Sequence, residues 1–176
     1  MKTHHFSLIR ITILATSLLL GISAHAAVDM FLEIPGVRGE APDDEFKDGI
    51  EVLAWSWGMS HSGSLGKASF QDLSVTKYVD RSSADLMLHV ANASHYPEAV
   101  LTVRKAGEKP VKYIKIVMKD VFVTSVSTGG SDGEDKLTEN VTFIFNEVRF
   151  EYTAQKKDGS AEDSPSIFEW NIGKGQ

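Results

Sequence analysis

Every second residue is apolar in several stretches of the chain, and this period of two predicts β-strands. The predicted strands cover residues 28–34, 50–59, 68–79, 99–105, 111–126, 137–152 and 168–172. Six or seven strands and one helix, without regular alternation of strands and helices, favour an antiparallel barrel or sandwich. We therefore expect a mainly β fold in a single domain.

One segment has the spacing of an amphipathic helix instead. Ser82 and Asp85 fit a capping box, and Leu86 and Val90 follow at helical spacing. The helix is expected to end before Pro97, because the residue that precedes a proline avoids the α region.

The second predicted strand, residues 50–59, carries large side chains on one face and small ones on the other. We expect the large face to lie in the core; it consists of Leu53, Trp55, Trp57 and Met59. The small face consists of Ala54, Ser56 and Gly58. Small side chains on a strand indicate either a surface that another molecule approaches closely or a solvated sheet face.

The apolar positions change parity within the last long strand. Val141 and Phe143 are odd, whereas Val148 and Phe150 are even. A single β-bulge near Asn146-Glu147 would shift the phase and keep both halves facing the core.

Residues 36–49 are polar, contain the acidic run Asp43-Asp44-Glu45 and are predicted to form a long loop. Loops of this length are often functional. An acidic run in such a loop is also typical of a simple solvated surface.

Charge divides the chain into a short basic start and an acidic body. The 176 residues include 18 Lys and Arg and 24 Asp and Glu, but residues 1–26 hold only Lys2 and Arg10. The rest therefore carries a net charge of −8. Binding to nucleic acid requires a basic face, so a nucleic-acid partner is not expected.

The basic start is followed by the apolar run 11–22 and by small residues at Ser23-Ala24-His25-Ala26. These are the three zones of a signal peptide, with cleavage before Ala27. As a helix the 12-residue run would span about 18 Å, short of the roughly 30 Å hydrocarbon core. We predict a signal peptide over residues 1–26; the alternatives are a core helix or a retained anchor.

The remaining sequence contains no pattern typical of a catalyst. Cysteine is absent, which excludes disulfide scaffolds and thiol nucleophiles. Gly58-Met59-Ser60-His61-Ser62-Gly63 misses the spacing of a nucleophile elbow by one residue. His89 and His95 lack paired-ligand spacing, and Asp132-Gly133-Glu134-Asp135 lacks the spaced ligands of an EF-hand loop. We expect no catalytic residue, metal or cofactor, and hence a binding or assembly module.

Long colinear blocks of the chain resemble the haemolysin-coregulated protein (Hcp) family. The blocks are AVDMF (27–31), EVLAWSWGMSHSGS (51–64), QDLSVTKYVDRSSADLM (71–87), HYPEAVLTVRKAG (95–107), STGGSDGEDKLTENVTF (127–143) and WNI (170–172). The resemblance extends over residues 27–172 and leaves 173–176 as a short tail.

This resemblance implies a two-sheet antiparallel β-barrel with one flanking helix. It also implies hexameric rings that stack into the inner tube of the type VI secretion system. A contracting sheath propels such a tube, a spike protein lies at its tip, and effector proteins travel in its lumen. The resemblance implies a secreted structural protein and no enzyme or cofactor.

The same resemblance suggests roles for two sets of residues. Ala54, Ser56 and Gly58 would face the lumen, where small side chains keep the pore open. Asp43, Asp44, Glu45 and Phe46 would lie in an extended loop that reaches a neighbouring ring.

The predicted signal peptide leaves a second function open. The family assembles its tube in the cytoplasm, whereas a cleaved leader would direct the chain into the periplasm. The alternative is therefore an exported Hcp-like barrel that binds a ligand or partner outside a tube.

Overall fold

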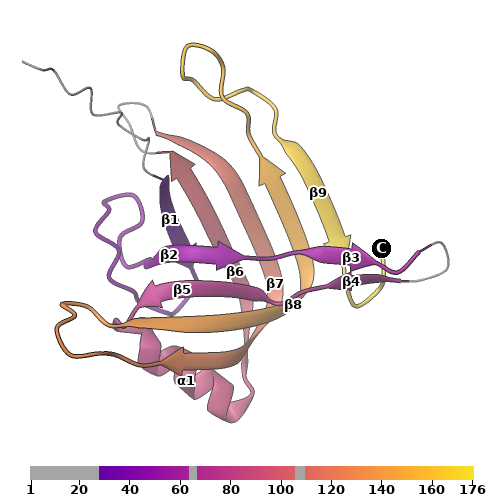
Figure 1. Ribbon diagram of the computed structural model, residues 1–176. Coiled ribbons are helices and arrows are strands. Elements are labelled where there is room, and N and C mark those ends of the chain that lie inside the picture. The colour runs from indigo at the N-terminus through magenta and orange to yellow at the C-terminus, as the bar shows by residue number, and fades with distance from the viewer. Residues whose placement is uncertain (1–27, 64–66, 106–109) are drawn as a thin grey trace, which may run out of the picture.

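Nine strands and one helix form the described part of the computed structural model, residues 28–63, 67–105 and 110–176 (Figure 1). The elements are β1 (Val28–Glu33), β2 (Ile50–Ser56), β3 (Met59–His61), β4 (Ala68–Phe70), β5 (Leu73–Tyr78), α1 (Ser82–Asn92), β6 (His95–Lys105), β7 (Val111–Thr128), β8 (Thr138–Tyr152) and β9 (Ser166–Asn171). The predicted signal peptide, residues 1–26, lies outside this part. No helix in the described residues is both long enough and apolar enough to cross a membrane.

Six of the strands close into a barrel in which every neighbouring pair is antiparallel. The order is β1, β2, β5, β8, β7 and β6, and β6 returns to pair with β1. β9 extends the sheet beside the second half of β8, and β3 and β4 form a separate hairpin that projects from the barrel (Figure 1). The predicted mainly β barrel with one helix is confirmed.

The long strands β7 and β8 each contribute to both sheets of the barrel, because both strands bend where Asp120 faces Asn146. In β7 the even-numbered Ile116 and Met118 are buried just before this point, and the odd-numbered Val121 and Val123 are buried just after it. Asp120, between them, has a positive φ of 53°. The first half of β8 pairs with β5, and its second half pairs with β9.

The predicted parity change in β8 is present, but the single bulge near Asn146-Glu147 is wrong. Lys119 lies opposite Glu147 and Val121 opposite Phe145, so the two strands stay in register through the change. Both strands kink together, which keeps both core faces without an extra residue. The register shift between them lies elsewhere, between Val123 and Ser125.

The predicted core face of β2 is partly wrong, because the pairing with β5 shifts between Val52 and Ala54. Before the shift, Val52 is buried in the core; after it, Trp55 packs against the core, and so does Trp57 beyond the end of the strand. Leu53 is only half-buried and lies outside the core cluster, and Met59 is 47% exposed.

The predicted capping box of α1 is also wrong. Arg81 is the N-cap residue and its side chain makes no capping bond. Asp80 does this work instead, since its Oδ1 accepts a hydrogen bond of 2.9 Å from the amide of Ser82. The helix ends at Asn92, well before Pro97, and its C-cap residue Ala93 has a left-handed φ of 54°.

Candidate assembly surfaces

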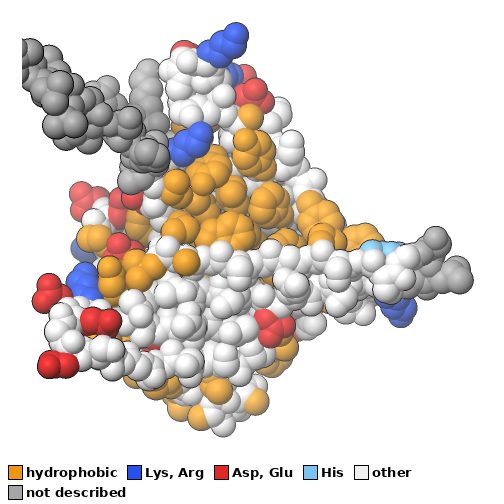
Figure 2. Space-filling view, viewed as in Figure 1, with side chains coloured by type: hydrophobic (Ala, Val, Ile, Leu, Met, Phe, Trp, Pro, Cys, Tyr) orange, Lys and Arg blue, Asp and Glu red, His pale blue; other side chains and the backbone are white. Residues whose placement is uncertain are grey.

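Small, uncharged side chains cover the outer face of one half of the barrel. Pairs of directly opposite residues run across it from β2 through β5 and β8 to the end of β7. We call this surface the polar face, and its residues are Ala54, Ser56, Ser74, Thr76, Asn140, Thr142, Ser125 and Ser127. None of them is buried, and Figure 2 shows the surface as a broad white area below an orange one.

Hydroxyl and amide groups on the polar face hydrogen-bond to one another. The Thr76 hydroxyl donates to Asn140 Oδ1 at 2.7 Å, and the Ser125 hydroxyl donates to Thr142 Oγ1 at 2.9 Å. Small side chains that carry no charge, several of them already hydrogen-bonded to one another, offer few strong contacts to a passing molecule. Chemically, this surface stays hydrated and adheres weakly.

The structure brings two of the three predicted lumen residues into the polar face. Ala54 lies opposite Thr76, and Ser56 lies opposite Ser74. Gly58 lies beyond the end of β2, where a Cβ atom would stand 2.9 Å from the Gln71 side-chain oxygen. The carbonyl of Gly58 accepts a hydrogen bond of 2.8 Å from the amide of Gln71, so Gly58 lies beside the segment that joins β4 to β5.

Sequence reasoning missed six residues of the polar face, although a signal for them exists. Residues 73–78 read Leu-Ser-Val-Thr-Lys-Tyr, and this alternation places Ser74 and Thr76 outward. The same rule applied to residues 138–143 places Asn140 and Thr142 outward. The strand pairing that joins them into one surface is not readable from the alternation.

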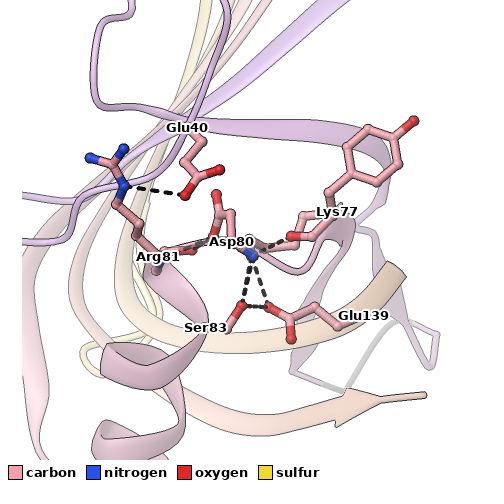
Figure 3. Close-up of polar contacts among 8 residues, drawn as sticks. Glu40, Lys77, Asp80, Arg81, Ser83 and Glu139 are labelled. Atoms are coloured by element: carbon pink, nitrogen blue, oxygen red, sulfur yellow. Dashed lines mark hydrogen bonds and ion pairs between the residues drawn. The ribbon is translucent and has the colours of Figure 1, made fainter. Parts of the chain in front are cut away.

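A buried ion pair lies inside the barrel behind the polar face (Figure 3). Lys77 Nζ donates to Glu139 Oε1 at 2.8 Å, and both side chains are fully buried. Lys77 also donates to Asp80 at 2.8 Å, and the Ser83 hydroxyl donates to Glu139 at 2.7 Å. Because Asp80 precedes α1 and Ser83 lies in its first turn, this network ties the helix to β5 and β8.

The loop between β1 and β2 folds back onto its own barrel. Phe46 is only 3% exposed and stacks on Phe31 with ring centroids 4.2 Å apart. The amides of Gly39 and Ala41 donate to the carbonyls of Asp48 and Gly49 at 2.7 and 2.9 Å. The loop is thus a closed flap in this structure.

Arg104 on β6 holds this flap by its charge. Its guanidinium donates to Asp29 at 2.9 Å and to Asp43 at 2.5 Å, and it lies over the Phe46 ring. The hydrogen bond from Arg104 lowers the pKa of the Asp43 carboxyl below its usual value. Of the four predicted ring-stacking residues, Asp44 and Glu45 are exposed, Asp43 is engaged and Phe46 is covered.

A second surface, which we call the aromatic patch, lies where the β3–β4 hairpin meets β9. The patch consists of Trp57, Phe70, Phe150, Phe168 and Trp170, all half-buried. Phe70 joins the two elements, with ring centroids 6.3 Å from Trp57 and 6.4 Å from Trp170. Figure 2 shows apolar side chains gathered here above the polar face. Extended apolar surface of this kind marks an interaction site.

The histidines singled out in the sequence make contacts within the chain. The His89 ring stacks on Tyr96, and its Nδ1 lies 2.8 Å from the Tyr96 hydroxyl. Burial raises the pKa of Tyr96 to about 12. His95 lies 3.5 Å from Asp120. Within the described residues, no three His, Cys, Asp or Glu side chains group closely enough to hold a metal ion.

Comparison with known proteins gives consistent matches. The family model described as "Type VI secretion system effector, Hcp" matches residues 31–152. Protein hcp1 of Pseudomonas aeruginosa is 52% identical over 155 residues, which cover 83% of this chain and 96% of that protein.

Solved structures show the same fold. Hcp1 from Salmonella typhimurium superposes with a TM-score of 0.70 at 35% identity, covering 84% of this chain and 96% of that one. A structure described as a type six secretion system protein superposes with a TM-score of 0.81 at 26% identity, covering 85% and 99%.

Proposed function

The chain belongs to the Hcp family of type VI secretion system proteins, and from this we propose that it is the structural subunit of the inner tube. The family consists of secreted structural proteins and not of enzymes. In the proposed role the chain forms hexameric rings, the rings stack, and effector proteins travel in the lumen. The sheath and the spike protein would be its other partners.

The observation that carries this proposal is the polar face together with its two open edges. Among the described residues, β1 pairs with β2 only at Ile50 and Glu51, so the rest of β2 has one free edge. β6 pairs with β7 only as far as Phe122, so the end of β7 beyond Phe122 forms the second free edge. Adding the β7 edge of one copy to the β2 edge of the next would continue the polar face from subunit to subunit.

A ring built in this way would turn the polar face toward its lumen. The face carries hydroxyl, amide and methyl groups, which suit a channel that must let folded cargo pass without holding it. Stacking of rings would use the exposed acids of the flap, Asp44 and Glu45.

Electron microscopy of the purified full chain tests the proposal. We expect open six-fold rings, and chains that stay monomeric at high concentration would contradict it. Ser56→Trp should preserve rings but narrow the lumen, so that co-purified effector falls severalfold. Unchanged effector retention would contradict the placement of Ser56 in the lumen.

The basic and apolar start of the chain favours a second candidate, an exported Hcp-like barrel that acts outside a tube. This candidate predicts a monomer in the periplasm whose first residue is Ala27. N-terminal sequencing of the protein from fractionated cells separates the two functions, because a tube subunit should be found in the cytoplasm with its start intact.

A further inference from the structure

Helix α1 exposes an apolar stripe on its outer side. Ala84, Met87, Leu88 and Ala91 are all exposed and recur at the spacing of one helix face. Leu88 is 56% exposed and Met87 is 40% exposed, whereas the inner side of the helix buries Leu86. We call these four residues the helix stripe. A helix that is apolar on its outer face still lacks a partner for that face.

The helix stripe and the aromatic patch lie at opposite ends of the polar face. Helix α1 packs against β7, the strand that forms one edge of the face. The aromatic patch lies beside β2, the strand at the other edge, on the β3–β4 hairpin and β9. Figures 1 and 2 show this order, with the helix below the polar strands and the patch above them.

We propose that the helix stripe of one copy docks on the aromatic patch of the next copy around the ring. The proposal rests on the tube function and names the surfaces that build the ring. The helix stripe lies next to the β7 edge, and the aromatic patch lies next to the β2 edge. Joining the β7 edge of one copy to the β2 edge of its neighbour therefore brings α1 of the first copy toward the aromatic patch of the second. The contact is head-to-tail, so a ring can close with every polar face turned inward.

The chemistry of the two surfaces matches. Met87 offers a flexible thioether and Leu88 a branched aliphatic group, and both pack well against half-buried aromatic rings. Charge is sparse on the helix, where Asp85 is the only acidic side chain of the first turn. A patch-to-patch contact would instead give closed dimers and leave the helix stripe in water.

Cross-linking the full chain tests the pairing, since the protein has no natural cysteine. Leu88→Cys marks the helix stripe, and Met59→Cys marks the border of the aromatic patch, where Met59 pairs with Phe70. With a short bis-maleimide, the double variant should give a ladder of covalent oligomers that ends at the closed ring. Each single variant should stay uncross-linked; efficient dimers from Met59→Cys alone would overturn the proposal in favour of patch-to-patch contact.

Arginine substitutions test the same contact by a second measurement, the fraction of protein in rings. Leu88→Arg should lower the fraction of protein in rings about tenfold at a fixed concentration, because six identical contacts each lose an apolar anchor. Ile167→Arg is the matched control, since Ile167 is 49% exposed and lies on β9 opposite Glu151, away from the patch rings. Circular dichroism checks that both variants fold. If Leu88→Arg does not fold, Leu88→Ala replaces it and should give a smaller loss of the fraction of protein in rings.

The outcomes separate this inference from the proposed function. Wild-type rings with no Leu88–Met59 cross-link, and equal ring fractions for the two arginine variants, would overturn the docking and leave the tube intact. Absence of rings in the wild type would overturn the tube itself.

Discussion

Two charged clusters each tie a segment to the barrel, and they do so in different surroundings. Lys77 and Glu139 are fully buried and anchor the start of α1. Arg104 remains 11% exposed and holds the flap through acids that are themselves partly in water. A buried ion has lost its hydration, so removing its partner is costly, whereas water replaces a lost partner near the surface. The difference indicates a permanent anchor at α1 and a releasable one at the flap.

The largest effect is expected at the buried pair. Lys77→Ala would leave Glu139 charged and unpaired, and should lower the free energy of unfolding by about 3–5 kcal/mol. Urea denaturation measures the change. Replacing both partners, with Lys77→Met and Glu139→Leu together, should restore part of that loss, because the fully buried carboxylate is removed together with the amine. Asp80, which is 8% exposed, still loses Lys77 in this double variant. A loss below about 1 kcal/mol in Lys77→Ala would erase the contrast between the clusters.

A smaller effect is expected at the flap. Arg104→Ala removes the bonds to Asp43 and Asp29 and the contact over the Phe46 ring, and should cost about 1–3 kcal/mol. Hydrogen exchange should show faster exchange at the Gly39 and Ala41 amides, whose bonds close the flap. Unchanged protection there would mean that Phe46 stacking alone holds the flap.

Strong acid should remove the contribution of Asp43 to the closed flap. The pKa of Asp43 lies below the ordinary 3.8 in the folded protein, so its contribution to stability is present above that value and is lost as the pH falls through the lowered pKa. Unfolding midpoints measured between about pH 5 and pH 2 should fall more steeply in the wild type than in Asp43→Asn. Parallel curves would show that Asp43 takes no part.

The smallest effect is expected at a solvent-exposed ion pair, which extends the comparison of buried and partly exposed charges to the protein surface. Arg38 and Asp48 are 3.5 Å apart, and their side chains are 72% and 41% exposed. Arg38→Ala should change the free energy of unfolding by no more than about 0.5 kcal/mol. A loss as large as that of Arg104→Ala would mean that burial is not the deciding variable.

Much of the fold was predictable because local alternation reports which side of a strand faces the core. The strands and the outward direction of Ala54 and Ser56 follow from the period of two, and the helix follows from its own spacing of three to four residues. The predicted core position of Leu53 was wrong because the shift between Val52 and Ala54 breaks the alternation. That of Met59 was wrong because Met59 lies on β3, which pairs with β4 in the hairpin that projects from the barrel. Such a shift depends on how β5 lies beside β2, which no local pattern records.

The caps and the assembly surfaces show the same limit. Ser82 looked like the capping residue, but the carboxylate that reaches the helix amides belongs to Asp80, which Lys77 also holds. Of the aromatic patch, Trp57 and Phe150 were predicted to face the core. Only the meeting of the β3–β4 hairpin with β9 leaves them half-exposed on one surface.

Lys77 and Glu139 mark the boundary between what the chain alone determined and what its folding decided. Alternation in each strand already places both charged side chains inward, after Leu73 and Val75 in one and before Val141 and Phe143 in the other. That the two lie directly opposite each other follows only from the register of β5 on β8. A strand's own sequence determines its two faces because they depend on a period of two, whereas its neighbour depends on the whole barrel closing.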